Sequence, residues 1–338
     1  MLALVLTTGL VAALLTAAFR HYALARNVVD IPNARSSHAV PTPRGGGAAI
    51  VLSTALAVIW LYAAGALTTP LVLVVSVGGG LVALIGFIDD HGHLAARWRL
   101  LGHFAAAAWT LAWIDGLPLA TIPGLAQLPA WAGWGLSSLF LVWMLNLFNF
   151  MDGIDGIASV EAVSTCLGGA LLYALSGQAQ AACLPLALAA AAGGFLLWNW
   201  PPARIFMGDV GSGFLGLMLG ILSLQAGGID PTLFWAWVVL MGVFIADATL
   251  TLGRRLLRGE QIHQAHRSHA YQHAARRHGR HLPVTLATAC INLLWLLPIA
   301  LGVATASLSI PAGLVLAYVP LGALALAYGA GAHESRAR

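Results

Sequence analysis

Two asparagines and two aspartates, each pair three positions apart, follow one another in the stretch NLFNFMDGIDGIA. Asn146 and Asn149 precede Asp152 and Asp155 between two long apolar runs. If the second run begins its helix here, the two carboxylates share one helix face. Acidic residues also suit the first turn of any helix, so capping is the alternative explanation. Four polar groups on neighbouring turns exceed what a cap needs, which favours a site that handles charge.

Two further acidic motifs lie at the ends of apolar runs. Asp89 and Asp90 are adjacent in FIDDHGH, where a solvated helix end would explain them. Two like charges at such an edge are nonetheless costly unless a cation or a basic partner compensates them. Asp209 lies in GDVGSGFLG, where a carboxylate meets free backbone N–H groups at a predicted helix start, with Arg204 upstream as an anion partner. This combination suits a hydrated Mg²⁺ shared with phosphate oxygens.

Basic residues collect in the segment 254–281, which carries seven arginines and six histidines. Its central part contains His263, His266, Arg267 and His269. Topological anchoring would explain the arginines, and transition-metal binding would explain the histidines. Arginine and histidine together suit a diphosphate better, because both donate hydrogen bonds to oxyanions.

A fifth polar segment, DIPNARSSHAVPTPRGGGAA, covers residues 30–49. Its prolines stiffen the loop, and its three consecutive glycines permit close backbone approach. The side chains that could bind an anion there are Ser36, Ser37, His38 and Arg44.

The chain that carries these motifs is strongly apolar. Of its 338 residues 59% are hydrophobic and 8% are charged, and its mean hydropathy of +0.85 lies far outside the range of soluble domains. Apolar runs of about twenty residues, enough to cross a bilayer as a helix, recur along it. We predict one all-α polytopic membrane domain over 1–338, with about ten to eleven transmembrane helices. The predicted spans are, roughly, 1–19, 46–66, 71–88, 100–116, 133–150, 157–176, 181–198, 211–227, 232–253, 284–303 and 308–328.

Charge is distributed unevenly between two sets of loops. The chain contains no lysine, and its sixteen arginines fall in alternate loops or flanks, at 20–44, 97–99, 204, 254–280 and 336–338. By the positive-inside rule the arginine-bearing side is cytoplasmic. Most acidic residues lie on that same side, so we expect a polar cleft that opens to the cytoplasm. The net charge of +4 therefore reflects arginines gathered on one side of a membrane protein and does not indicate binding of nucleic acid.

Two acidic residues lie deeper in the spans. Glu161 and Asp247 are about one or two turns inside their runs, and ionisable residues at such depth are functional candidates. A divalent-metal transporter is one alternative, because it would combine buried carboxylates with a histidine-rich loop. Transport needs a polar pathway to the outer side, however, where only Asp115 and Asp230 are acidic. That weighs against transport.

Together the five motifs resemble those of the polyprenyl-phosphate N-acetylhexosamine 1-phosphate transferases, glycosyltransferase family 4. The stretches DIPNARSSHAVPTPRGGG, FIDDH, NLFNFMDGIDGIA, GDVGSGFLG and HRSHAYQH occur in that family's order and spacing, and they cover nearly the whole chain. The family includes the peptidoglycan translocase for phospho-N-acetylmuramoyl-pentapeptide and the GlcNAc 1-phosphate transferases that start O-antigen and teichoic acid synthesis.

The resemblance implies transfer of a sugar 1-phosphate from a UDP-N-acetylhexosamine to undecaprenyl phosphate, which gives a lipid diphosphate sugar and UMP and requires Mg²⁺ or Mn²⁺. With the residue types above, it assigns the candidate site. The candidates are Asp89, Asp90, Asp152 and Asp155 as catalytic groups; Asn149, Arg44, Arg204, His263, His266, Arg267 and His269 as substrate contacts; and Asp209 and Asp152 as metal ligands.

The histidine segment also indicates the branch of the family. HQAHRSHAYQH departs from the triple histidine expected of the peptidoglycan translocase and is more similar to the O-antigen-initiating branch, whose donors include UDP-GlcNAc, UDP-FucNAc and UDP-QuiNAc. The translocase is the alternative function. The expected location is the bacterial inner membrane, within the lipid bilayer and with the active site on the cytoplasmic side, and a homodimer is compatible with the resemblance.

Overall fold

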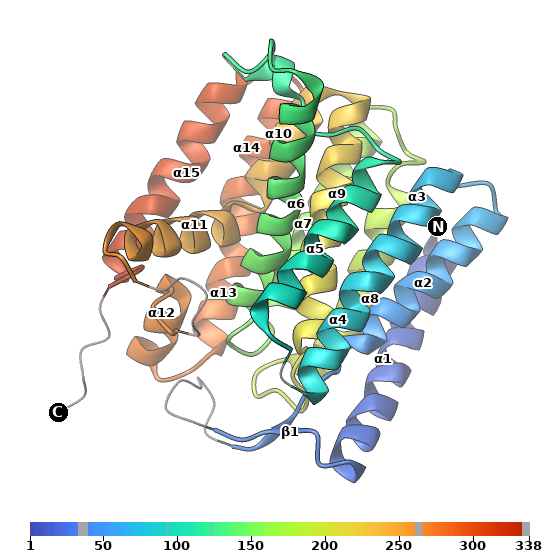
Figure 1. The fold of residues 1–338 in the computed structure, drawn as a ribbon, viewed down its shortest axis with the longest axis vertical. Coiled ribbons are helices and arrows are strands. Elements are labelled where there is room, and N and C mark those ends of the chain that lie inside the picture. The colour runs from blue at the N-terminus through green and yellow to red at the C-terminus, as the bar shows by residue number, and fades with distance from the viewer. Residues whose placement is uncertain (33–39, 93, 123, 261–265, 333–338) are drawn as a thin grey trace.

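The computed structural model describes residues 1–32, 40–92, 94–122, 124–260 and 266–332. In these ranges the chain is almost entirely helical, and β structure is limited to one short antiparallel pair of strands at the end of the bundle (Figure 1). In that pair Val29 lies opposite Pro43, and Asp30 lies opposite Thr42. The all-α fold predicted from the composition is confirmed.

The elements follow one another along the chain as listed here. They are α1 (Leu2–Ala25), β1 (Val29–Asp30), β2 (Thr42–Pro43), α2 (Ala48–Ala63), α3 (Thr69–Leu73), the π-helical turn η1 (Val74–Gly79), α4 (Gly80–His91), α5 (Ala96–Leu111), the 3-10 turn η2 (Leu119–Thr121), α6 (Ala130–Met151), α7 (Ile157–Leu175), α8 (Cys183–Asn199), α9 (Asp209–Ile229), α10 (Pro231–Leu240), α11 (Gly242–Leu257), α12 (Ala270–His278), α13 (Leu282–Ile291), the π-helical turn η3 (Asn292–Leu296), α14 (Leu297–Ala304) and α15 (Ile310–Ala327).

Every predicted span coincides with helical structure. Within the described ranges seven continuous helical segments are long and apolar enough to cross a membrane, and α2 and α8 are shorter apolar helices. The ninth predicted span, 232–253, is wrong as a single straight helix. It breaks at Met241 into α10 and α11, which are bent by 73° relative to each other, and α11 runs across the direction of its neighbours (Figure 1). The prediction of a multi-pass membrane protein is confirmed.

Helices α7 and α9 form the centre of the bundle, and α1 and α15 lie at its edge. The central pair is buried over most of its length, whereas the outer pair is largely exposed. On α1 large apolar side chains are exposed at every fourth position, at Leu2, Leu6, Leu10 and Leu14. Such a stripe is stable against lipid tails and not against water, so this face of α1 contacts the bilayer.

Small residues bring α9 into backbone contact with its neighbours. A Cβ atom on Gly216 would lie 2.5 Å from the carbonyl oxygen of Met144 in α6, and one on Gly86 in α4 would lie 2.5 Å from the backbone of Asp209. Glycine at both positions therefore permits the close packing that small residues give membrane helices. As a result the last turn of α4 lies directly against the first turn of α9.

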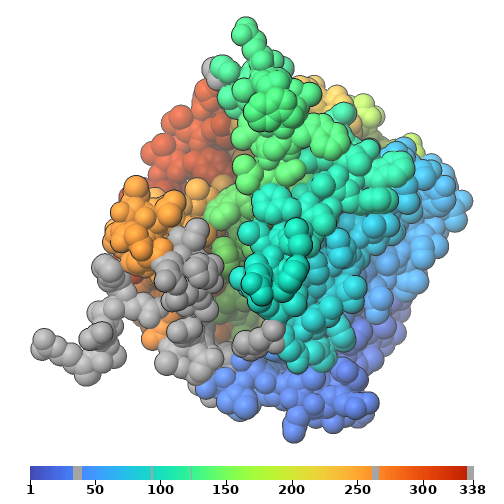
Figure 2. All heavy atoms as spheres, in the orientation of Figure 1, coloured from blue at the N-terminus to red at the C-terminus, as the bar shows by residue number. Residues whose placement is uncertain are grey.

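The segments that carry arginine meet at one end of the bundle (Figure 1). They are the end of α1, the segment that follows β2, the first turn of α5, the loop between α8 and α9, and α12. In the space-filling view α11 and α12, coloured orange, lie at one side of the molecule (Figure 2). Because the arginine-bearing segments gather at one end, the two ends of the bundle differ in charge, as the distribution of arginine in the sequence indicates.

Candidate active site

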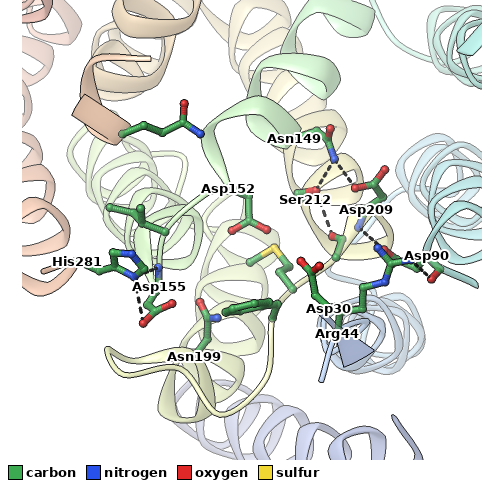
Figure 3. A pocket seen from close by; sticks show the side chains of 16 residues that line it. Asp30, Arg44, Asp90, Asn149, Asp152, Asp155, Asn199, Asp209, Ser212 and His281 are labelled. Atoms are coloured by element: carbon green, nitrogen blue, oxygen red, sulfur yellow. Dashed lines mark hydrogen bonds and ion pairs between the residues drawn. The ribbon is translucent and has the colours of Figure 1, made fainter. Parts of the chain in front are cut away.

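A cavity of about 290 Å³ lies at the arginine-bearing end, where α4, α6 and α9 meet the loops before α7 and α9. It is lined by Asp30, Arg44, Asp90, Asn149, Asp152, Gly153, Ile154, Asp155, Asn199, Phe206, Met207, Gly208, Asp209, Ser212, Gln272 and His281. Figure 3 shows Asp152 directed into it, with Asp209 and Asn149 to one side and Asp155 and His281 to the other. Five of the sixteen lining residues are aspartates and one is an arginine, so the cavity needs added positive charge.

Asp90 joins the end of α4 to the beginning of α9. Its two carboxylate oxygens accept hydrogen bonds from the backbone N–H groups of Asp209 (3.1 Å) and Val210 (3.2 Å). These amides belong to the first turn of α9, which has no partners for them within the helix. Arg44 donates to the backbone carbonyl of Asp90. Asp90 is thus buried with its charge compensated by a helix start.

Asp209 is held on the cavity wall by two side chains. The Asn149 Nδ2 donates to its Oδ1 over 2.8 Å and to the Ser212 Oγ over 3.0 Å (Figure 3). The Arg99 Nη1 lies 3.2 Å from its Oδ2. The Asp209 side chain keeps 35% of its surface exposed, so part of it remains accessible to a ligand although both oxygens have protein partners. Helix α9 begins at Asp209, two residues before the predicted span 211–227, so Gly211 and Ser212 lie within its first turns.

Asp89 does not line the cavity, although its carboxylate interacts with that of Asp209. Its carboxylate contacts Arg99 and accepts the backbone N–H of Leu94 over 2.8 Å. Because Arg99 also approaches Asp209, the arginine connects the two carboxylates. The structure therefore does not bring Asp89, predicted as a catalytic group, to the cavity surface with Asp90.

Asp152 and Asp155 lie in the loop that connects α6 to α7 and not on a helix. Helix α7 begins only at Ile157, because Gly156 before it has a left-handed φ of +76°. Helix α7 thus coincides with the predicted span 157–176, and the condition for a common helix face of the two aspartates is not met, although both line the cavity. Burial, and then the nearby charge of Asp209, raise the pKa of Asp152 well above its usual range.

The carboxylate of Asp155 is bound by other groups of the protein. Its Oδ2 accepts the backbone N–H of Ala203 over 3.1 Å and lies 3.2 Å from the His281 Nδ1. Asn199 adds a second tie, since its Oδ1 accepts the N–H of Gly156 and its Nδ2 donates to the carbonyl of Ile205, both over 2.9 Å. These contacts fix the loop before α7 against the loop before α9.

The predicted basic contacts fall in different places. Arg44 lines the cavity, whereas Arg204 is exposed and lies over the ring of Trp198, 5.9 Å from its centroid. His266, Arg267 and His269 do not line the cavity in the part of the chain that the structure describes. His263 lies outside the described residues.

His266 and His269 stack on each other in the segment that leads into α12. Their ring centroids are 4.9 Å apart, and the His266 Nδ1 is 2.9 Å from the Ser268 Oγ. Burial, and then the neighbouring His269, lower the pKa of His266 to about 4. His266 is therefore neutral near pH 7 and can act as a hydrogen-bonding group, not as a fixed positive charge.

Several cavity residues were not among the predicted site residues. They are Asp30, Asn199, Phe206, Ser212, Gln272 and His281. The one local signal for Asn199 is an amide between two tryptophans at the end of an apolar run, and Gln272 lies inside the HRSHAYQH motif. Asp30 and Ser212 also lie inside quoted motifs, DIPNARSSHAVPTPRGGG and GDVGSGFLG, and His281 ends the basic segment. Only Phe206 has no such signal and reaches the cavity through tertiary structure alone.

The donor set fits a hydrated divalent cation more than a protein-enclosed one. Among the described residues no three His, Cys, Asp or Glu side chains are grouped closely enough to hold a metal by themselves. Mg²⁺ usually takes one or two carboxylates and completes its shell with water and phosphate oxygens. The partly exposed Asp209 side chain and the nearby carboxylate of Asp152 suit a cation bound in this way, because the cation would relieve the repulsion between the two carboxylates.

Comparison with known proteins adds independent information. Residues 72–227 match the model of glycosyl transferase family 4. The chain is 29% identical to a probable undecaprenyl-phosphate N-acetylglucosaminyl 1-phosphate transferase of Bacillus subtilis, over 76% of this chain and 72% of that protein. It is 30% identical to a decaprenyl-phosphate N-acetylglucosaminephosphotransferase of Mycolicibacterium smegmatis, over 80% and 76% of the two chains.

A third relative, a phospho-N-acetylmuramoyl-pentapeptide-transferase of Moorella thermoacetica, is 31% identical over 54% of this chain and 63% of its own. The matched family region contains Asp90 at the end of α4, Asp152 in the loop after α6 and Asp209 at the start of α9. The chain therefore belongs to glycosyl transferase family 4 and is a membrane-embedded glycosyl-1-phosphate transferase.

Proposed function

We propose that this protein transfers N-acetylhexosamine 1-phosphate from a UDP-sugar to undecaprenyl phosphate, with release of UMP. The observation that carries the proposal is the single cavity that holds Asp90, Asp152 and Asp209 together with Arg44 at the arginine-bearing end. A site for two phosphate substrates needs polar groups that bind oxyanions, cations that screen them and a position next to the membrane. The cavity offers polar groups, one arginine and a position at the ends of membrane helices, and its carboxylates would hold the cation that completes the screening.

The named relatives favour GlcNAc 1-phosphate as the transferred group. The B. subtilis and M. smegmatis relatives, whose names specify N-acetylglucosamine, align over 76% and 80% of the chain. The pentapeptide transferase of M. thermoacetica aligns over 54%. We therefore propose UDP-GlcNAc, or a 6-deoxy relative such as UDP-FucNAc or UDP-QuiNAc, as the donor. The product would begin a cell-envelope polysaccharide such as O-antigen.

The proposed chemistry requires little proton transfer. A phosphate monoester has a second pKa of about 6, so near pH 7 most undecaprenyl phosphate is already a dianion. One of its oxygens attacks the sugar-bearing phosphorus of the donor. The new P–O bond forms as the bond from that phosphorus to the bridging oxygen breaks, and UMP leaves with the electron pair. The main obstacle is the approach of two anions, so positioning and charge screening dominate the catalysis.

The residues of the cavity divide into two groups in this scheme. Asp209 and Asp152 would hold Mg²⁺, or Mn²⁺ in its place, which when bound screens the phosphate charges and orients their oxygens. Arg44 would donate to a phosphate oxygen, as arginine does in many phosphate sites. Asp90, by contrast, is occupied by the first turn of α9, and its part is to hold that turn in place.

A reconstituted assay tests the function. Purified protein in detergent would be given undecaprenyl phosphate, UDP-GlcNAc and Mg²⁺, and released UMP and the lipid diphosphate sugar would be measured. A panel of UDP-sugars would identify the donor, and metal uptake into proteoliposomes would test the transporter alternative. Uptake of metal without UMP release from any donor would overturn the proposal.

We also propose that the cavity faces the cytoplasm in the bacterial inner membrane, on the strength of the arginine distribution. The segment of η2 and helix α12 lie toward opposite ends of the bundle (Figure 1). Ala120 in η2 and Arg277 in α12 are exposed, so each can be replaced by cysteine in a background that lacks the three native cysteines. In intact cells an impermeant maleimide should label Ala120→Cys and not Arg277→Cys. The reverse pattern would place the cavity outside.

A further inference from the structure

Asp247 is a buried acidic residue that no step of the proposed reaction uses. It lies in α11, is 5% exposed and does not line the catalytic cavity. Its carboxylate is nevertheless well supplied with donors. Oδ1 accepts the N–H of Ala270 and the hydroxyl of Thr251, and Oδ2 accepts the N–H of Tyr271, each over 2.9 Å.

The two backbone donors are the first N–H groups of α12, which begins at Ala270. The first N–H groups of a helix have no partners within it and must be satisfied from elsewhere. A helix of nine residues gains little stability on its own. A charged acceptor that reaches from a separate helix therefore fixes both the start of α12 and its position against α11.

The same end of α12 reaches the catalytic loop. The Tyr271 hydroxyl donates to the backbone carbonyl of Phe150 over 2.9 Å, two residues before Asp152. Gly153, on the other side of Asp152, is packed so closely that a Cβ there would come within 2.1 Å of the Tyr271 hydroxyl oxygen. The next residue of α12, Gln272, lines the cavity.

We infer that Asp247 is a positioning residue for the transferase reaction. From α11 it anchors the first turn of α12, so that Tyr271 supports the loop bearing Asp152 and Gln272 closes the cavity wall. The bend at Met241 is part of this arrangement, because it directs α11 across the bundle toward α12. The expected loss of turnover rests on the proposed function. The anchoring of α12 and of the loop at 150–153 does not.

Asp247→Asn tests the inference, with Asp230→Asn as the matched control. Asparagine keeps one acceptor oxygen and turns an amide NH₂ toward the other N–H donor. Asp230 is also a helix cap, since its Oδ1 accepts the N–H and the hydroxyl of Thr232 over 2.7 Å, but it lies at the far end of α9 from the cavity. We expect kcat/KM for the UDP-sugar to fall about tenfold in Asp247→Asn and less than about twofold in Asp230→Asn.

A double-mutant cycle with Tyr271→Phe separates positioning from general stability. If both residues act through α12 and the loop at 150–153, the double variant should be no worse than the poorer single variant within about twofold. Tyr271→Phe combined with Asp230→Asn should match Tyr271→Phe alone within about twofold, because Asp230→Asn has little effect by itself. Multiplication of the Asp247→Asn and Tyr271→Phe effects would show that the two residues act independently and would overturn the inference. Unchanged turnover in Tyr271→Phe would overturn it as well, even if Asp247→Asn failed to fold.

Hydrogen exchange supplies a readout that needs no substrate. The backbone amides of peptides covering 266–278 and 150–156 should exchange faster in Asp247→Asn than in the native protein. In Asp230→Asn their exchange rates should equal those of the native protein. A native protein that turned over no UDP-sugar would refute the proposed function and leave this measurement intact. Unaltered exchange in both peptides would refute the positioning role.

Discussion

Asn149 gives the most direct test of how the cavity works. One amide nitrogen of Asn149 donates to Asp209 and to Ser212, at 2.8 and 3.0 Å, and so sets the orientation of the carboxylate on the cavity wall. The substitution Asn149→Ala removes both hydrogen bonds without adding charge or bulk. The earlier asparagine of the same helix provides the control, because the Asn146 Nδ2 donates to the carbonyl of Val142 in its own helix.

The size of the effect follows from the type of bond that is lost. A hydrogen bond to a charged group contributes about 1.5–3 kcal/mol, and each 1.4 kcal/mol corresponds to about tenfold. If Asp209 must hold its orientation in the transition state, kcat/KM of Asn149→Ala should fall about tenfold to a hundredfold. Asn149→Asp should lose more, because it replaces the donor by a carboxylate that faces Asp209 at hydrogen-bonding distance.

The assay compares the three variants under one set of conditions. UMP release would be measured against donor concentration for the native protein, Asn149→Ala, Asn149→Asp and Asn146→Ala, after each has been shown to be monodisperse and equally stable to heat. We expect Asn146→Ala to remain within about threefold of the native protein. If Asn149→Ala were as active as Asn146→Ala, the hydrogen bond to Asp209 would have no part in catalysis.

Three other predictions follow from the same geometry. Asp209→Asn should abolish most activity and shift the remainder to much higher Mg²⁺, and a Mg²⁺ titration with the native dependence would remove Asp209 from the metal site. Gly153→Ala should impair turnover because of its contact with Tyr271, and the assay should show partial recovery in the double variant with Tyr271→Phe; no recovery would mean that the steric argument is wrong. Folding keeps His266 neutral, so the unfolded chain binds a proton between about pH 6.5 and about pH 4 that the folded protein does not, and stability is lost as the pH falls through this window. The melting temperature of His266→Gln should therefore fall less than that of the native protein between pH 7 and pH 5, and equal losses would contradict the assigned neutral state.

The helical fold was predictable because membrane spans depend on composition more than on tertiary contacts. A run of about twenty apolar residues must form a helix in a bilayer, whatever packs beside it. The break at Met241 could not be found in this way. Hydropathy records that 232–253 is apolar, whereas the 73° bend depends on how α10 and α11 pack with the helices around them.

Part of the candidate site was predictable, because charged residues at the ends of apolar runs are easily recognised in the sequence. Asp90, Asp152 and Asp209 lie where the apolar runs stop, and the structure brings all three to one cavity. The residues that these and the neighbouring aspartates contact could not be predicted from the sequence. The contact of Asp155 with His281 joins residues far apart in the chain, and the start of α7 depends on the backbone conformation of Gly156 and not on the spacing of the aspartates.

The bonds from Asp90 to the first amides of α9 have a consequence for how substrates enter. They tie the ends of two membrane helices together, and α9 is itself packed in the centre of the bundle, so this side of the cavity cannot widen without breaking both bonds. The opposite side consists of the loop at 152–156, the short helix α12 and the strand pair, none of which crosses the membrane. One wall of the cavity is thus built from membrane helices, and the other from segments outside the membrane whose position depends on single side-chain contacts, such as those of Asp155 and Tyr271. We expect the proposed nucleotide sugar to enter along the second wall.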